Sequence, residues 1–293
     1  MSSPEFERLC DGPLAPALAG LETQRHAAVR RFGLMMAGAG IVALLAAFLV
    51  PDISFKIFAV LFILFFGWLV ASRPLEATAR SLKEPAVAAI SAARSLSYTD
   101  TGFSADGYEA IHPLLGRPSG RTFRDRFSGE RGGTPFAFYA AALISGSGKS
   151  RREVFKGMIY VVTRRPVQGE TVIMPDRGLF NFFSPGRGMD RVRFEDDPDF
   201  ERTFEVYSTQ ADEARGLINP VTRQALKAWR AQGGQMFVRL AADQATVAIA
   251  GPDDRFGVGA MLKPIPGRER IRGLWDDLER ALSQVDQVRS VFG

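Results

Sequence analysis

The sequence predicts an α+β protein in which a two-helix transmembrane hairpin is followed by a helical stalk and a mainly antiparallel sheet with covering helices. Three observations predict it: two apolar runs within residues 32–72, short strand-like segments between turns in residues 121–174, and a long amphipathic segment at the end of the chain. The expected parts are a polar N-terminal arm (1–31), the hairpin (32–50 and 53–72), the stalk (73–98) and an α+β domain (99–293).

The two apolar runs have the length and composition of membrane spans. Residues 32–50 contain no charge, and residues 53–72 contain only Lys56. Roughly 20 apolar residues are needed for a helix to cross the hydrocarbon core. A cleaved secretory signal is the alternative for the first run, but a long arm with acidic residues precedes it and a second run follows directly. We therefore expect a multi-pass membrane protein.

Basic residues flank the outer ends of the two runs, and this pattern predicts the orientation. Lys and Arg accumulate on the cytoplasmic side of membrane proteins, so both termini are expected in the cytoplasm and the hairpin in the inner (plasma) membrane. Anionic lipid headgroups are the expected contact of these side chains. The flanking basic residues are Arg25, Arg30, Arg31, Arg73, Arg80 and Lys83.

Small residues recur at helical spacing in the first run, and bulky aromatic residues recur in the second. A strip of small residues allows a second helix backbone to approach closely, so we expect the aromatic residues to fill the groove. The alternative is that they contact lipid or another subunit. The small residues are Ala39, Gly40, Ala43 and Ala47, and the aromatic residues are Phe58, Phe62, Phe65 and Phe66.

The chain after the hairpin changes from helix to strands and back to helix. Residues 75–98 have helical periodicity, with Pro85 expected to kink or split the helix. Residues 98–120 are expected to be irregular. The expected strands are 121–127, 136–144, 154–163, 170–174, 200–208, 235–241 and 245–250.

Three helices are predicted among these strands by their caps and apolar stripes. Thr209 is expected to cap a short helix that ends near Gly216, and Asn219 followed by Pro220 is typical of a helix start. The last helix carries its apolar residues on one face and is expected to dock on the sheet. Its stripe consists of Ile271, Leu274, Trp275, Leu278, Leu282, Val285, Val288 and Phe292.

Several stretches resemble a bacterial family called domain of unknown function thirty-one thirty-seven. The resemblance extends from about residue 20 to residue 290. It implies a polar arm, two spans, a stalk and a cytoplasmic α+β domain, and it implies no activity, cofactor or site residue. The loop from Gly178 to Gly188 departs from the family's pattern. The stretches are residues 154–162, 169–173, 204–208 with 213–215, and 219–220.

Two motifs invite a ligand interpretation. The sequence Gly146-Ser-Gly-Lys-Ser150 resembles the end of a phosphate-binding loop, but the first glycine of that motif is replaced by Leu143 and a strand follows, so we expect a hairpin tip. Glu195, Asp196, Asp197 and Asp199 form a dense acidic cluster. Four carboxylates could hold a hard cation, but acidic runs are more often solvated surface, and we expect no metal and no cofactor.

Positive charge is concentrated in the first part of the α+β domain. Residues 117–193 contain 15 Lys plus Arg and 6 Asp plus Glu, a net charge of +9, whereas residues 194–293 contain 13 and 16, a net charge of −3. Headgroup contact is a hypothesis for a loop that combines arginine and phenylalanine, and the alternative is a core position for its rings. Nucleic acid is not expected, because no recognition signature accompanies the loop. The loop residues are Arg177, Phe180, Phe182, Phe183 and Arg187.

The sequence offers no legible catalytic set. The one cysteine, Cys10, lies in the polar arm, and the two histidines, His26 and His112, accompany no identifiable nucleophile. The leading hypothesis is a non-enzymatic adaptor or scaffold whose cytoplasmic domain binds a protein partner, or itself, or the anionic membrane surface. A membrane-anchored enzyme such as a hydrolase, with its site between the strands and the last helix, is the alternative. A channel is a third, although neither span has a polar strip.

Overall fold

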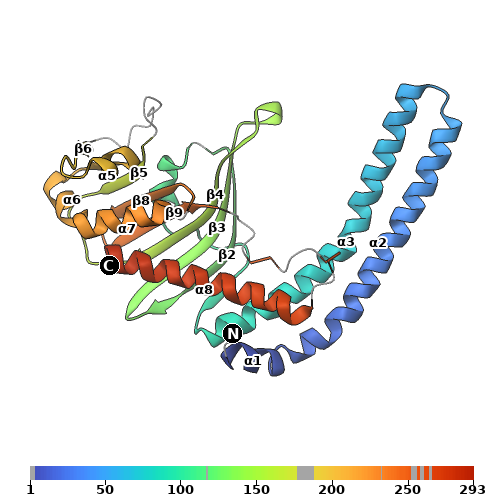
Figure 1. The fold of residues 1–293 in the computed structure, drawn as a ribbon, viewed down its shortest axis with the longest axis horizontal. Helices are drawn as coiled ribbons and strands as arrows, with labels where there is room; N and C mark the ends of the chain where they lie inside the picture. The colour runs from blue at the N-terminus through green and yellow to red at the C-terminus, as the bar shows by residue number, and fades with distance from the viewer. Residues whose placement is uncertain are drawn as a thin grey trace. The chain divides into compact units, whose positions relative to one another are not determined.

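The computed structural model describes residues 4–116, 118–176, 188–231, 233–251, 256–257, 261–263 and 266–293 (Figure 1). The chain divides into two compact units. A helical unit comprises Met1–Ala93 and Phe256–Leu278, and a sheet unit comprises Arg94–Arg255 and Glu279–Gly293. This division differs from the single domain predicted over residues 99–293, because the first part of the last helix packs with the N-terminal helices.

The helical unit contains two long helices that are apolar enough to cross a membrane. In α2 (Ala15–Leu49) and α3 (Ile53–Ala93), the most apolar windows have mean hydropathies of 2.3 and 2.4, and 6% and 0% of their residues are buried within the protein. Outward-facing apolar side chains such as Phe48, 88% exposed, account for this. The two predicted apolar helices are therefore present. Both continue beyond the predicted spans, since α2 begins within the polar arm and α3 includes most of the stalk.

Of the two outcomes predicted at Pro85, a kink or a split of the stalk, the split does not occur. Helix α3 runs without interruption through Pro74 and Pro85. A proline removes one backbone donor from a helix, but buried apolar residues continue on both sides of Pro85, from Leu82 to Ala86. Burial of this stripe against the unit's other helices outweighs the lost hydrogen bond.

The N-terminal arm is helical and docks on the last helix. Helix α1 (Pro4–Asp11) contacts the first half of α8 (Gly267–Phe292). The Phe6 ring lies edge-on to Trp275, with 6.0 Å between ring centroids, and the Arg272 guanidinium lies 4.7 Å from the centroid of the Phe6 ring. Arg268 forms ion pairs with Glu7 and Asp11. The arm is thus fixed by one aromatic contact and by charged contacts around it.

The sheet unit contains one antiparallel sheet with nine strands in the described residues. Their order across the sheet is β1-β2-β3-β4-β9-β8-β5-β7-β6, and every pair is antiparallel. The predicted antiparallel α+β fold is confirmed. The strands are β1 (Ser97–Thr99), β2 (Gly120–Arg131), β3 (Thr134–Ser145), β4 (Arg152–Thr163), β5 (Thr171–Pro175), β6 (Asp190–Val192), β7 (Phe204–Ser208), β8 (Met236–Ala241) and β9 (Gln244–Ala250).

The sheet is covered by short and long helical segments. A core cluster joins β3, β4, β5, β8 and β9 to α4 (Tyr108–Ile111) and η1 (His112–Leu114), which form within the stretch predicted to be irregular. The second half of α8 crosses the sheet (Figure 1), where Arg131 Nε donates to Asp286 Oδ1 over 2.8 Å. Every residue of the predicted apolar stripe is buried. Docking of the last helix on the sheet is confirmed for the part that begins at Glu279.

Capping residues explain where the remaining helices begin. The predicted strand 200–208 starts as helix α5 (Pro198–Thr203) and becomes strand only at Phe204, because the Asp197 side chain accepts from Phe200 N and nucleates a helical turn. Thr209 does not cap α6 (Ala211–Leu217), because its hydroxyl accepts from the backbone N–H of Glu170, the residue before β5. The cap predicted at Asn219 is confirmed at α7 (Pro220–Ala231), where its Oδ1 accepts from Val221 N over 2.9 Å.

The glycine-rich motif of residues 146–150 forms the predicted hairpin tip. Strands β3 and β4 pair up to Ser145 and Arg152, and a single turn, η2 (Gly148–Ser150), joins them. A phosphate-binding loop leads into a long helix, which this segment does not. The side chain of Lys149 lies outside the described part of the chain.

Candidate functional site

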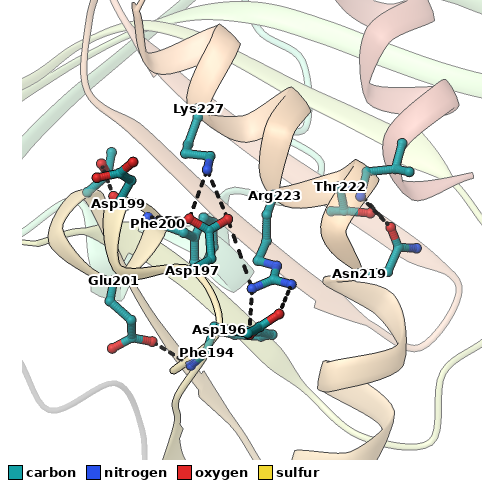
Figure 2. Close-up of polar contacts among 12 residues, drawn as sticks. Phe194, Asp196, Asp197, Asp199, Phe200, Glu201, Asn219, Thr222, Arg223 and Lys227 are labelled. Carbon is teal, nitrogen blue, oxygen red and sulfur yellow. Dashed lines mark hydrogen bonds and ion pairs between the residues drawn. The ribbon is translucent and has the colours of Figure 1, made fainter.

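The acidic cluster predicted from the sequence folds into the turn that precedes α5 (Figure 2). Asp197 accepts from Phe200 N over 3.1 Å and so caps α5, and Glu201 Oε1 accepts from Phe194 N over 2.8 Å. Both carboxylates are therefore used by the backbone of their own segment.

Helix α7 supplies the cations that face this turn. Arg223 and Lys227 lie one helical turn apart, so both side chains point to the same side. The Arg223 guanidinium binds Asp196 through two hydrogen bonds of 2.9 and 2.6 Å. Lys227 Nζ donates to both oxygens of Asp197, each over 2.9 Å. The cluster joins α5 to α7 by charge-assisted hydrogen bonds, which are among the stronger polar contacts in proteins.

Arg223 is the buried centre of this cluster. The residue is 4% exposed, its guanidinium lies 5.1 Å from the centroid of the Phe194 ring, and Nε has no hydrogen-bond partner among the described residues. The hydrogen bonds from Arg223 lower the pKa of Asp196, and those from Lys227 lower the pKa of Asp197. Asp196 in turn raises the pKa of Arg223. All three groups are held in their charged forms.

The carboxylates of the acidic cluster are paired with cations, and this pairing limits which ligands they can bind. Asp196 and Asp197 face Arg223 and Lys227, and Asp199 pairs with Arg202 on the surface. Within the described residues, no group of three or more His, Cys, Asp or Glu side chains is arranged to hold a metal ion. The cluster is a docking contact between helices. The sequence did not identify the cations of this cluster, Arg223 and Lys227. Their spacing of one helical turn on a buried helix was the pattern that could have identified them.

An open pocket adjoins the cluster. It has a volume of about 610 Å³ and is bordered by the end of β6, the end of α6 and the start of α7. Three arginines and two carboxylates line it together with Phe194, Ile218, Asn219 and Pro220; the charged residues are Arg193, Arg215, Arg223, Glu195 and Asp196. Arg193 is exposed, and Arg215 pairs with Asp212 over 2.8 Å at the surface. The pocket combines apolar surface with charged side chains of both signs, and two of its three arginines are paired with carboxylates.

The two long helices pack through small residues, as their sequence suggests, but not against the predicted aromatic partners. Gly67 of α3 approaches Ala39 of α2 so closely that a Cβ on Gly67 would overlap the Cβ of Ala39. Ala43 is buried, whereas Gly40 and Ala47 are half-exposed. The groove is filled by backbone approach at Gly67. The predicted partners Phe58, Phe62 and Phe65 are instead 63%, 51% and 57% exposed and face away.

The predicted headgroup contacts divide into three groups. Arg30, Arg31 and Arg73 are exposed, Arg80 is exposed beside Glu76, and Lys83 is half-exposed. Arg25 does not fit the expectation, because it is 7% exposed and its Nε donates to Glu22 over 3.0 Å. The loop residues Arg177, Phe180, Phe182, Phe183 and Arg187 lie outside the described part of the chain.

The remaining candidates are held by neighbouring groups. His112 Nδ1 lies 3.1 Å from the carbonyl oxygen of Glu109, and its ring lies beside Tyr108. Cys10 is 1% exposed within the helical unit, and this burial raises the pKa of its thiol. A buried thiol with a raised pKa is a poor nucleophile. Its setting in the sequence, a polar arm, gave no sign of this burial.

Comparison with known proteins finds similarity to a family over part of the chain. The crystal structure of the mycobacterial trehalose monomycolate transport factor A, TtfA, aligns with 12% sequence identity and a TM-score of 0.36, covering 68% of this chain and 95% of that chain. No curated protein matches the sequence. The family model described as protein of unknown function (DUF3137) matches residues 153–289, most of the sheet unit. The chain is therefore similar to this family over residues 153–289.

Proposed function

We propose that the chain is a membrane-anchored, non-enzymatic adaptor. In this proposal α2 and α3 cross the inner membrane as a hairpin, both termini face the cytoplasm, and the sheet unit binds a protein partner through the arginine-lined pocket. The exposed basic residues at the base of the hairpin contact anionic headgroups.

The main support for a membrane anchor is the position of the exposed arginines along the axes of the two long helices. Counting from the contact of Ala39 with Gly67, antiparallel packing brings Gly33 opposite Arg73, so Arg30, Arg31 and Arg73 fall within about one helical turn of each other. On one side of this level the outward side chains are apolar, as at Leu34, which is 65% exposed. An apolar surface bounded by a ring of arginines matches the boundary between hydrocarbon and headgroups.

Cysteine labelling in intact spheroplasts tests the orientation. In a Cys10→Ala background, Ser54→Cys places a thiol beside the connecting turn and Thr23→Cys places one on the arm; both positions are exposed. A membrane-impermeant maleimide is expected to label the first variant in intact cells and the second only after lysis. The reverse pattern would contradict cytoplasmic termini, and labelling of both would contradict the hairpin.

The arginine-lined pocket is the surface proposed for the partner. Val221, at the start of α7, is 76% exposed beside this pocket. Arginine and apolar side chains gathered around a depression are typical of residues that dominate binding energy at interfaces. Arg223 and its carboxylate partners hold the floor of the pocket in place, so the surface is formed before a partner arrives.

A charge-reversal pair tests this surface. The double variant Arg193→Glu and Arg215→Glu alters the pocket, and Arg124→Glu is the matched control, since Arg124 is exposed on β2, outside the pocket. Proteins cross-linked in native membranes to the unaltered chain and to the control are expected to be lost from the double variant. Equal recovery from all three chains, by quantitative mass spectrometry, would remove the pocket from the proposal.

A further inference from the structure

The outer edge of β2 is only partly covered by a neighbouring strand. β1 pairs with residues 126–128, whereas residues 120–124 pair only with β3 among the described strands. A bulge at Asp125 separates the two parts, and the backbone N–H of Asp125 donates to the carbonyl oxygen of Asp100 over 2.9 Å. Pairing with β1 therefore stops at the bulge, and no described strand covers the edge beyond it.

The chain that follows β1 crosses the face of the sheet and does not return to this edge. The Phe103 ring lies 5.6 Å from the Tyr139 ring of β3, measured between centroids. A Cβ on Gly107 would meet Val161 of β4 and Thr246 of β9. Both contacts lead away from β2 toward the centre of the sheet. The open edge of a strand is a template on which an extended peptide can add as a further strand.

The open segment carries different side chains on its two faces. The Phe123 ring and the Arg121 guanidinium lie 4.8 and 5.4 Å from the centroid of the Tyr108 ring, so both are on the face that α4 covers. Side chains alternate along a strand, which places Thr122 and Arg124 on the opposite face, and both are exposed. One face therefore offers an aromatic ring and the other a polar, basic surface.

Positive charge is in excess around the open segment. Arg124 forms no ion pair with a described residue, and two further arginines are exposed at the tip of the hairpin that joins β3 and β4 (Figure 1). Acidic side chains of a partner would meet this charge favourably, whereas a second copy of the chain would bring the same charge to the edge. The exposed arginines are Arg121, Arg124, Arg151 and Arg152, and the exposed carboxylates among them are Glu109, which pairs with Arg121, and Glu153.

We propose that residues 120–124 bind an extended segment of a partner protein in which acidic and apolar residues alternate. The segment adds to the sheet as a strand beside β2. Its acidic side chains lie on the face of Thr122 and Arg124, and its apolar side chains lie beside Phe123. Main-chain hydrogen bonds provide the affinity, and the alternating side chains provide the selectivity. The arginine-lined pocket lies near β6, at the opposite edge of the sheet, so neither proposal depends on the other.

Three labelled heptapeptides test the strand addition on the purified full-length chain in detergent. The first alternates glutamate and valine, the second has the same sequence with methylated backbone nitrogens, and the third has lysine in place of glutamate. Fluorescence anisotropy is expected to detect binding of the first and binding weaker by about tenfold or more for the other two, because they lose main-chain donors or the matching charge. Absence of binding by the first peptide, or equal binding by the methylated one, would overturn the proposal.

Two arginines provide a matched pair of variants. Arg124→Glu reverses the charge beside the open edge, and Arg165→Glu makes the same change at an exposed position beyond the other end of β4. Affinity for the glutamate peptide is expected to fall about tenfold in the first variant and to stay unchanged in the second. The lysine peptide is expected to bind Arg124→Glu more tightly than the unaltered chain, which misfolding would not produce. Unchanged affinity of both peptides for Arg124→Glu would overturn the proposal.

Two other occupants of the edge are distinguished with the same peptide. Phosphatidylserine added to the detergent micelles is expected to leave the affinity for the glutamate peptide unchanged, and displacement of the peptide would assign the arginines to lipid. Light scattering is expected to show the same oligomeric state with and without the peptide. A fall in molar mass when the peptide binds would assign the edge to a second copy of the chain. Either result would overturn the proposal.

Cross-linking in native membranes separates this edge from the arginine-lined pocket. A partner of the edge is expected to be lost from Arg124→Glu and retained by the double variant Arg193→Glu and Arg215→Glu, whereas a partner of the pocket shows the reverse pattern. Failure of one proposal is therefore distinguishable from failure of the other. Retention of every cross-linked protein by Arg124→Glu would contradict binding at the edge.

Discussion

The two long helices of the hairpin differ along their length in where their large side chains point: outward in one part and inward in the other. Between residues 32 and 72 the large side chains point outward, as at Leu44, which is 72% exposed. In the parts of α2 and α3 outside that range they point inward: Leu21 and Leu82 are each 2% exposed. The helix geometry is the same throughout. The face that carries the apolar residues decides which environment each part fits.

The contacts between the two helices differ in the same way. Where the exterior is apolar, the helices meet through Gly67 and Ala39, and where the exterior is polar, buried leucines such as Leu21 and Leu82 pack within the helical unit. In water, burial of a large apolar side chain stabilises packing in proportion to the area removed from solvent. In lipid that gain disappears, and close backbone approach between small residues takes its place. The hairpin therefore combines both kinds of packing: burial of large apolar side chains in one part and close approach of small residues in the other.

The largest expected effect comes from truncating a leucine in the polar part. Leu82→Ala removes a buried side chain and is expected to destabilise the folded protein by about 3 kcal/mol. Leu44→Ala makes the same change at an outward-facing position, and little loss of stability is expected. Thermal unfolding of both variants in detergent measures the difference. Similar losses in both would break the comparison.

A smaller effect is expected from enlarging a glycine in the apolar part. In Gly67→Leu the new side chain overlaps Ala39 and forces the helices apart, at a cost of about 2 kcal/mol. Gly38→Leu is the control, because a Cβ at Gly38 meets nothing within 4 Å. Cross-linking between cysteines placed in α2 and α3 reports helix separation. If Gly67→Leu cross-links as efficiently as the control, the contact at this position does not hold the hairpin together.

Two arginines allow a similar comparison for charged side chains, because one is buried and the other is exposed on the hairpin. Arg223→Ala removes both hydrogen bonds to Asp196 and is expected to destabilise the protein by about 1.5 kcal/mol, since hydrogen bonds to charged groups contribute that much. Arg73→Ala, at an exposed position on the hairpin, is expected to leave folding stability unchanged and to weaken only the proposed contact with anionic lipid. Chemical denaturation of each variant distinguishes the two roles, and a loss of stability in Arg73→Ala would assign it a partner within the fold.

The smallest effect concerns the acidic turn and depends on pH. Hydrogen bonds from Arg223 and Lys227 lower the pKa values of Asp196 and Asp197 from the ordinary 3.8. A carboxyl group with a lowered folded pKa stabilises the protein above its unfolded pKa, and this stabilisation is lost as pH falls through the folded value. The melting temperatures of the unaltered chain and of Asp196→Asn should therefore differ at about pH 6 and converge below 3.8. A constant difference would show that the ion pair does not contribute.

Periodicity and caps made much of the fold predictable. The stripe of α8 and the cap at Asn219 are local patterns, and both appear in the structure as expected. Thr209 shows the limit of local reasoning, because a hydroxyl that could cap α6 instead accepts from Glu170 N across the sheet. The role of Arg223 was hidden for the same reason, since its partners lie 27 residues away in sequence.

By itself, the sequence determined the two apolar helices, the strands of the sheet other than β1 and β6, and the amphipathic last helix, because each follows from spacing along a single segment. Tertiary structure alone decided which faces meet. It placed Gly67 rather than Phe62 against α2, buried Arg25 and Cys10, and divided α8 between two units. The physical reason is that burial and ion pairing depend on which surfaces come together in space, and a linear pattern does not record that.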